Sequence, residues 1–241
     1  MGIILPRTKR REWLLTLGYR FFHILRFISP RLRLGVALDF SWLLDRYVHD
    51  LSFEHYDASS HPWRRESANF ILDRITPSDS ILDLGCGDGA LSALLGKKAG
   101  RVLGVDGMPE RIAFARSNYS SPAIQFEISE LTEFVLKTEE RFGAILLSNV
   151  IEHLDNPCEI LRRCRRNAAA LYVEVPDFEC SLTNLYRVDL RRSIIYTDND
   201  HVREFDRSEV RALLQESGWA VASEDHRHGV LRFWATAQPD N

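Results

Sequence analysis

The chain has 241 residues, 45% of them hydrophobic and 27% charged, with 13 glycines and 9 prolines, a profile that fits one α/β unit and excludes disordered, collagen-like and low-complexity chains. The net charge of −3 divides unevenly, because the residues up to Arg33 carry eight basic groups and one acid, a net of +7, and the rest of the chain carries −10. A body this acidic excludes general nucleic-acid binding, and four cysteines without a CxxC pair fit reduced thiols in the cytoplasm.

The basic N-terminal stretch, residues 9–33, predicts an amphipathic helix with a wide apolar face. Aromatic and aliphatic side chains alternate there with Arg20, His23 and Arg26 at helical spacing. These basic residues interrupt the apolar run before it reaches the roughly 18 residues of a membrane span. Two interpretations stay open: the aromatic face packs on the body of the protein, or the helix lies on the inner face of a membrane with its arginines toward anionic headgroups.

Residues 34–74 predict helices that are broken around His61 and Pro62, and this segment is rich in aromatic residues. Aromatic residues at helical spacing usually belong to a core, although this segment is also suited to roof a pocket. We therefore take residues 1–66 as an N-terminal helical extension and residues 67–241 as the main domain.

From residue 79 onward, short apolar runs alternate with helical stretches, which is the pattern of a parallel sheet buried on both faces. The predicted strands are 80–84, 101–106, 123–128, 142–148 and 169–175. The predicted helices are 90–98, 110–118, 131–140, 157–167 and 208–217. Two further strands, 219–225 and 230–237, flank a turn at 226–229 and are expected at the edge of the sheet. The fold class is thus α/β, a doubly wound, seven-stranded Rossmann-like sheet with an antiparallel last strand.

A glycine-rich loop follows the first strand and opens the next helix. Its glycines let a ligand approach the backbone amides. Gly85, Gly87 and Ala90 satisfy the GxGxxA pattern, and Asp106 lies about 20 residues on, where an acid binds ribose hydroxyls. These features alone would be explained by a nicotinamide dinucleotide.

The fuller string, residues 81–89, closely resembles the first motif of class I S-adenosylmethionine-dependent methyltransferases. Three later motifs continue the resemblance: 102–106, 126–131 and 142–154. Motifs in this order are far more specific than a glycine triplet. The resemblance covers roughly residues 67–237 and implies S-adenosylmethionine as the cofactor, with a substrate insertion at about 177–203 that forms a lid or wall.

Carried over position by position, the resemblance implies a cofactor site along the carboxyl edge of the sheet. The residues that it implies are Asp83, Gly85, Cys86, Gly87, Asp106, Met108, Glu130, Leu131, Ser148 and Asn149. Gly85 and Gly87 would approach the aminoacyl portion, which Asp83 helps to orient. Asp106 would accept hydrogen bonds from the ribose, and Glu130 would meet the adenine amino group. Ser148 and Asn149 would face the reactive methyl group.

The candidate catalytic residues are Glu152, His153 and His201. His153 is the candidate base, because a neutral imidazole accepts a proton near neutral pH. The run from Asn149 to His153 is similar to the Glu-x-x-Glu-His run of ubiquinone-biosynthesis O-methyltransferases and small-RNA 2′-O-methyltransferases, which binds a divalent metal, and His201 resembles the later histidine of that site. Because Asn149 replaces the first Glu and an amide binds a hard cation weakly, we expect no metal. The alternatives are that Glu152 and His153 only shape a turn and that His201 contacts substrate.

The sequence as a whole predicts O-methylation of a hydroxyl on a small molecule, a sugar, or a lipid-linked glycan or quinone precursor. A non-catalytic S-adenosylmethionine-binding regulatory or scaffold protein is the alternative, since Asn149 departs from the metal-binding pattern. An NAD-dependent oxidoreductase is the less favoured one. The predicted location is the cytoplasm. If residues 9–33 lie in a membrane interface, the protein also contacts the inner face of that membrane.

Overall fold

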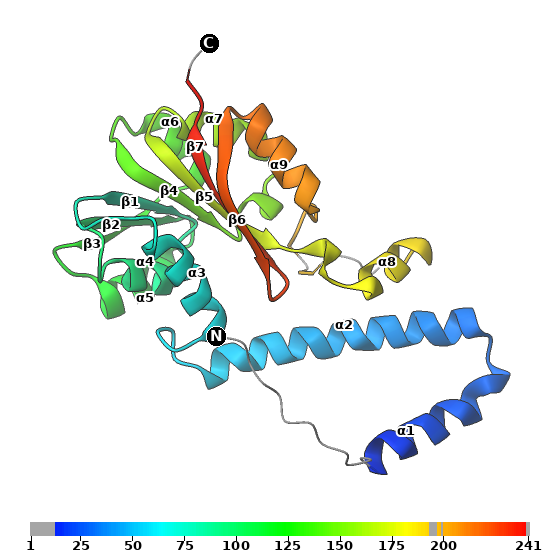
Figure 1. The fold of residues 1–241 in the computed structure, drawn as a ribbon. Helices are drawn as coiled ribbons and strands as arrows, with labels where there is room; N and C mark the ends of the chain where they lie inside the picture. Colours follow the sequence, from blue (N-terminus) through cyan, green and yellow to red (C-terminus); the bar gives the residue numbers. More distant parts are fainter. Residues whose placement is uncertain (1–12, 193–196, 199, 240–241) are drawn as a thin grey trace.

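The computed structural model of the protein describes residues 13–192, 197–198 and 200–239. In this part, strands form a seven-stranded sheet in the order β3-β2-β1-β4-β5-β7-β6, with helices on both faces (Figure 1). The parallel strands are β1 (Ser80–Leu84), β2 (Arg101–Asp106), β3 (Ile124–Ile128), β4 (Phe142–Ser148) and β5 (Ala168–Pro176). The hairpin strands are β6 (Trp219–Arg227) and β7 (Val230–Ala237), and β7 is antiparallel to both of its neighbours. The predicted doubly wound sheet is therefore confirmed.

The hairpin differs from the prediction in two ways. β7 lies between β5 and β6, so the prediction of two edge strands is wrong for β7. The turn consists of His228 and Gly229, at φ 60° and 75°, and β6 continues to Arg227 instead of ending at Asp225. A two-residue turn with both residues in the left-handed region matches the twist of paired strands. Two residues are therefore enough to connect β6 and β7.

Helices of the main domain connect the strands and cover the sheet. They are α3 (Pro62–Leu72), α4 (Ala90–Leu95), α5 (Pro109–Tyr119), α6 (Leu131–Lys137), α7 (Pro157–Cys164) and α9 (Arg207–Glu216), with the 3-10 turns η2 (Ile151–His153) and η3 (Phe178–Cys180). α4, α6 and α7 end earlier than predicted, because the chain turns back sooner toward the next strand. Asn167 fixes one such turn, where its side-chain amide donates to the carbonyls of Thr138 and Glu140.

The core consists of two apolar layers, one on each face of the sheet. Neighbouring residues of a strand point to opposite faces, so Ile81 and Leu82 enter different layers, as do Ile145 and Leu146. The expected domain boundary between residues 66 and 67 falls inside α3, whose Ala68 and Ile71 are buried. α3 thus packs on one face of the sheet and carries the chain from α2 to β1.

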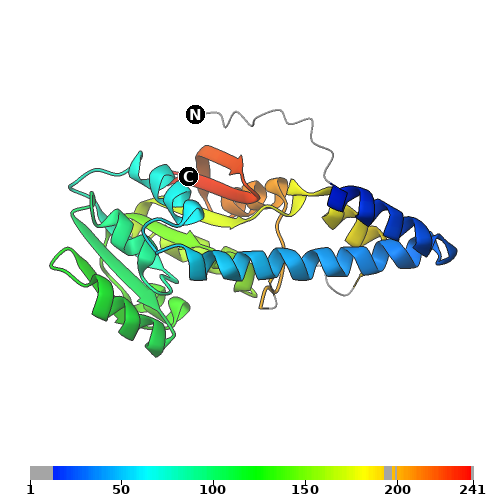
Figure 2. The ribbon, with the colours of Figure 1, turned by 90° about the horizontal axis from the view of Figure 1, so that it is seen from below.

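The N-terminal helices form an arm that extends away from the sheet (Figures 1 and 2). The arm consists of α1 (Trp13–Ile24), η1 (Leu25–Phe27) and α2 (Pro30–His55), a continuous helix that begins after the N-cap Ser29. Most of the α1 residues whose burial is described are exposed, 72% for Trp13 and 60% for Phe22, so the structure does not show the packed alternative. Residues 9–12 of the predicted amphipathic stretch lie outside the described residues. None of the described helices combines the length and the apolar character needed to span a bilayer.

The insertion after β5 packs on α2. It contains α8 (Leu182–Asp189), where buried Arg187 donates to the carbonyl of Leu38 at 3.1 Å. Arg192 pairs with Asp39, and Arg46 of α2 pairs with Asp198. These contacts fix the insertion to the arm.

Candidate functional site

The loop after β1 passes through the left-handed region at Gly85 and Gly87, with φ of 76° and 55°. A Cβ at Gly85 would lie 2.5 Å from Cγ2 of Val150, so only glycine fits there. A Cβ at Gly87 would meet no described atom within 4 Å. The loop is therefore tightly packed on its inner side at Gly85 and open to a ligand at Gly87.

Asp106, at the end of β2, braces this loop. Its Oδ2 accepts from the backbone N–H of Gly87 at 3.0 Å, and its Oδ1 accepts from that of Met108 at 2.9 Å. Each oxygen of a carboxylate has a second lone pair, so both can still accept from a ligand hydroxyl. The structure thus places a buried carboxylate, with acceptor capacity left, beside the open part of the loop.

Glu130 lies just before α6 and caps this helix. Its carboxylate accepts from the backbone N–H of Glu133 at 2.8 Å and from the hydroxyl of Thr132 at 3.1 Å. Burial alone would raise the pKa of Glu130, but these hydrogen bonds lower it, so the side chain is an anion. The contact with adenine stays a prediction. In that contact, the carboxylate of Glu130 would have to accept from the adenine amino group as well as from the cap donors of α6.

A cavity of about 410 Å³ opens at the carboxyl ends of β1 and β4, where open α/β sheets bind ligands. Of the predicted site residues, its wall contains Asp83, Gly85, Cys86, Gly87, Ser148 and Asn149. Residues that sequence reasoning missed complete the wall: Phe53, Trp63, Arg64, Ser67, Asp88, Leu91, Arg111 and Glu174. The wall does not include Asp106, Met108, Glu130 or Leu131, nor any described residue of the predicted lid.

The N-terminal helices close one side of this cavity. Phe53 from the end of α2 and Trp63 from α3 supply an aromatic wall, and their ring centroids are 5.9 Å apart. Arg64 ties α3 to the glycine loop, since its Nη2 donates to Oδ2 of Asp88 at 2.6 Å. The helical extension thus contributes directly to the site.

Asp83 lies at the cavity floor and is 1% exposed. The hydroxyl of Ser92 donates to its Oδ2 at 2.5 Å. Burial raises the pKa of Asp83 to about 6, and the nearby carboxylates of Asp106 and Asp88 also raise it.

Asp83→Asn is expected to stabilise the ligand-free protein at pH 7. Because the pKa is higher in the folded state than in the unfolded chain, stability falls as the pH rises from about 4 to about 6, and this loss is complete above that range. The variant escapes the loss, which corresponds to roughly 3 kcal/mol at pH 7 and about 1 kcal/mol at pH 4.5. Asn keeps an acceptor for Ser92. Urea unfolding of both proteins at these two pH values tests the sign, and a variant that is less stable at pH 7 would contradict it.

A buried ion pair lies behind the cavity. Glu174 of β5 and Arg232 of β7 stand directly opposite each other and are 0% and 1% exposed. Nε of Arg232 donates to Oε2 of Glu174 at 2.8 Å. The hydroxyls of Tyr172 and Ser67 donate to the same oxygen at 2.6 and 2.5 Å. The sequence does contain a signal for this pair, because each residue is the one charge in an apolar strand.

The other oxygen of Glu174 orients the end of β4. Oε1 accepts from the hydroxyl of Ser148 at 2.9 Å and from the side-chain amide of Asn149 at 3.3 Å. Asn149 has φ 53°, a conformation that Asn tolerates better than most residues. Glu174 therefore holds the two residues that we expect beside the reactive methyl group.

Glu174→Ala is expected to lower the free energy of unfolding by about 3–5 kcal/mol, because it removes the partner at 2.8 Å from the buried guanidinium of Arg232 and leaves it the carboxylate of Asp225 at 3.5 Å. Urea unfolding measures the loss. Glu159→Ala is the matched control, since its ion pair with Arg163 is at the surface and is worth about 1 kcal/mol or less. Equal losses in the two variants would show that the buried pair has no special weight.

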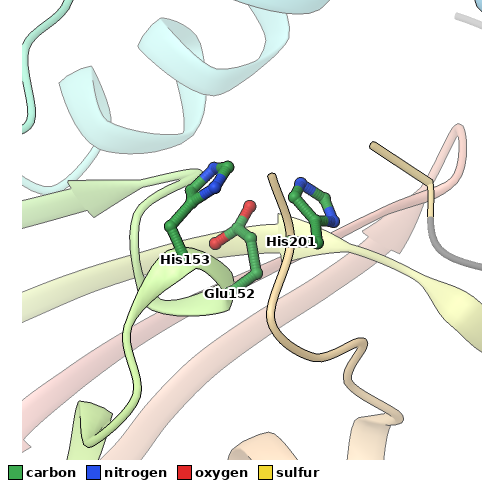
Figure 3. Close-up of side chains that lie close together, drawn as sticks. All are labelled: Glu152, His153 and His201. Carbon is green, nitrogen blue, oxygen red and sulfur yellow. The ribbon is translucent and has the colours of Figure 1, made fainter. Parts of the chain in front are cut away.

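The three predicted catalytic residues come together at the carboxyl edge of the sheet (Figure 3). Glu152 and His153 belong to η2, and His201 lies near the end of the insertion. One side-chain N or O atom from each residue lies within 4.8 Å of the other two. The two imidazole rings meet edge to face, with centroids 4.8 Å apart, and the carboxylate of Glu152 lies beside them (Figure 3). Glu152 and His153 follow Ser148 and Asn149 closely in the chain, but none of the three residues is part of the cavity wall formed by the described residues.

The electrostatics of this cluster are unusual. Both carboxylate oxygens of Glu152 are buried and have no hydrogen-bond partner among the described residues, and burial raises the pKa of Glu152 to about 8. Burial alone would lower the pKa of His201, but its hydrogen bond to Glu204 at 2.9 Å and the charges of Glu204 and Glu152 raise it. An unpartnered buried carboxylate is costly unless it is protonated or binds a cation.

One carboxylate and two imidazoles fit a divalent transition metal, so Glu152, His153 and His201 are the residues that would hold one. The side-chain amide nitrogen of Asn149 donates to Ser148 and Glu174, and a neutral amide binds a cation only through its oxygen. The expectation of no metal stays a prediction.

His153 has a second environment, on the side of Asp200. Its Nδ1 lies 3.2 Å from the carbonyl oxygen of Asp200 and 3.5 Å from the carboxylate. With Nδ1–H donating to this carbonyl, Nε2 carries the free lone pair. The ring thus has the tautomer that a proton acceptor at Nε2 needs.

Comparison with known proteins agrees with this architecture. Residues 53–224 match the profile of a family described as a methyltransferase domain. The human mitochondrial ubiquinone biosynthesis O-methyltransferase is 35% identical over 89 residues, which are 35% of this chain and 24% of that protein. The ubiquinone biosynthesis O-methyltransferase of Pseudomonas putida is 28% identical over 127 residues, 46% of this chain and 55% of that protein. The alignments thus span between a quarter and about half the length of these relatives.

Solved structures show the same fold. Magnesium protoporphyrin IX methyltransferase from Synechocystis, with bound SAH, aligns with a TM-score of 0.58 and 15% identity over 72% of this chain and 83% of that chain. An S-adenosylmethionine-dependent methyltransferase from Archaeoglobus fulgidus aligns with a TM-score of 0.56 and 17% identity over 72% of this chain and 94% of that chain.

Proposed function

The chain belongs to the methyltransferase-domain family, and from that premise we propose that it is an active O-methyltransferase whose acceptor carries a hydroxyl group. Its cofactor is S-adenosylmethionine, which supplies the sulfonium methyl group. The observation that carries the proposal is the cluster of Glu152, His153 and His201, because transfer to a hydroxyl requires a proton acceptor at the sheet edge where the methyl group is presented.

The residues present fit the cofactor. The open loop at Gly87 leaves room for the aminoacyl portion, and both oxygens of Asp106 can still accept from ribose hydroxyls. Ser148 and Asn149 lie in the wall of the same cavity, held by Glu174. These groups position the cofactor, and positioning supplies much of the rate in a transfer of this kind.

Nε2 of His153 accepts the proton of the acceptor hydroxyl, while the carbonyl of Asp200 holds the ring at Nδ1. A divalent cation bound to Glu152, His153 and His201 would occupy this lone pair of His153, and it would then lower the pKa of a coordinated hydroxyl and orient it in place of the base. Without a cation, the high pKa of Glu152 keeps this carboxyl protonated at neutral pH.

For the acceptor we favour a phenolic ring such as a quinone precursor. The aromatic wall of Phe53 and Trp63 suits a flat ring, and two relatives are ubiquinone biosynthesis O-methyltransferases. A sugar or a lipid-linked glycan is the less favoured acceptor. The four cysteines are free thiols, which supports the cytoplasm as the location.

Calorimetric titration with S-adenosylmethionine, S-adenosylhomocysteine and NAD tests which cofactor the protein binds. Assays of methyl transfer to catechols and sugars test the proposed reaction. Micromolar binding of the two sulfur compounds with turnover of a catechol is expected. Binding without turnover of any acceptor would favour the scaffold alternative, and binding of NAD alone would overturn the proposal. Turnover that survives chelation would support the expectation of no metal.

A further inference from the structure

The methyltransferase site leaves one large surface unexplained, the outer face of the helices at the far end of the arm. We call it the distal surface and define it as the exposed side chains of α1, of α2 up to Tyr47 and of α8. These three helices gather at the end of the molecule away from the sheet (Figures 1 and 2). Its most exposed apolar side chains include Trp13 at 72%, Tyr19 at 75% and Leu182 at 68%.

The α2 part of the distal surface is a continuous apolar stripe. Leu32, Val36, Phe40, Leu43 and Tyr47 recur every three or four residues and therefore share one face of the helix. All five are more than half exposed, from 54% for Leu43 to 61% for Phe40 and Tyr47. An exposed apolar face of this length marks an interaction site.

Charge identifies the occupant of this surface. Between Trp13 and Leu38 the sequence has no Asp or Glu, whereas Arg20, Arg26, Arg31 and Arg33 fall in this segment. A second copy docked here would bring two such segments together, each of charge +4, which is unfavourable. An anionic lipid surface attracts the same segment, by about 1 kcal/mol for each arginine near it.

The side-chain types agree with a lipid interface. Trp, Tyr and Phe, which are abundant on the distal surface, favour the headgroup region, where an apolar ring and a polar edge are both accommodated. The described helices include none that could span a bilayer, so the arm would lie on the membrane and not in it.

We propose that the distal surface docks on an anionic lipid bilayer. The inward face of α2 carries the buried residues Gly35 and Leu38, which Arg192 and Arg187 of the insertion contact, so the outward stripe is free for lipid while the inward face stays bound to the protein. α2 also reaches the cavity at its other end, where Phe53 is part of the wall. Docking thus holds the site at a fixed position near the lipid surface. Methylation of an acceptor carried in that lipid would be a further step, and only this step rests on the proposed function.

Cosedimentation of the full chain with vesicles tests docking directly. The expected result is binding to vesicles of phosphatidylcholine mixed with phosphatidylglycerol, weaker binding to phosphatidylcholine alone, and release by salt. Phe40→Glu and the double variant Arg20→Glu/Arg26→Glu should each lower the partition coefficient about tenfold or more. Phe114→Glu is the matched control, since Phe114 is 50% exposed on α5, and it should bind as the unchanged chain does.

Two further measurements, of the oligomeric state and of the affinity for S-adenosylmethionine, separate lipid docking from its alternatives. Failure of the unchanged chain to bind anionic vesicles, equal binding by Phe40→Glu, or a dimer that Phe40→Glu dissociates would each overturn the lipid assignment. Titration of the same variants with S-adenosylmethionine should be unaffected, because the substituted residues lie outside the cavity wall. Vesicle binding by a chain that does not bind S-adenosylmethionine would refute the proposed function and leave docking intact.

Discussion

Asp106→Ala is expected to lower the affinity for S-adenosylmethionine about a hundredfold or more. The carboxylate is expected to accept two hydrogen bonds from the ribose, and bonds to a charged acceptor contribute about 1.5–3 kcal/mol each. The substitution also releases the backbone N–H groups of Gly87 and Met108, so the loop loses its brace as well. Isothermal calorimetry measures the affinity.

Two variants show which part of this loss comes from the ribose. Asp106→Asn keeps one acceptor oxygen but loses the charge, so its affinity should lie between those of the alanine variant and the unchanged chain. Glu127→Ala removes an exposed carboxylate from the neighbouring strand β3 and should bind normally. Undiminished affinity in a folded Asp106→Ala protein would refute the ribose assignment.

The sequence predicts the parallel part of the sheet closely, and the reason is local. β1, β2 and β4 have the bounds expected from their apolar runs, since a strand buried on both faces is apolar at nearly every position and is bounded by polar residues. The position of β7 between β5 and β6 could not be predicted from local apolar runs. Which strand pairs with β5 depends on contacts between segments that are far apart in the chain.

The same distinction applies to the site. The cofactor loop and the run that ends at His153 are contiguous, so a resemblance finds them, and His201 was found because its own short motif matches. Phe53, Arg64 and Glu174 come from other segments, and only the fold brings them to the cavity. For Glu174 and Arg232, an acid and a base in apolar strands were the available signal, but only strand pairing shows that they face each other.

His153→Ala is expected to lower turnover about 10²- to 10⁴-fold and to leave the affinity for S-adenosylmethionine unchanged. The imidazole would take the proton of the acceptor hydroxyl. Single-turnover kinetics with a catechol acceptor measures the chemical step. His228→Asn is the matched control, because His228 is exposed in the hairpin turn and Asn tolerates its φ of 60°.

The other members of the cluster separate a base from a metal ligand. If His153 acts as a base alone, added imidazole should restore part of the turnover of His153→Ala, and chelation should not affect the unchanged chain. If the cluster holds a cation, Glu152→Gln and His201→Ala should lower bound metal and turnover together, and imidazole should not rescue them, because a lost ligand changes the whole coordination shell. Near-normal turnover of His153→Ala would leave Glu152 and His153 with the structural role of shaping η2.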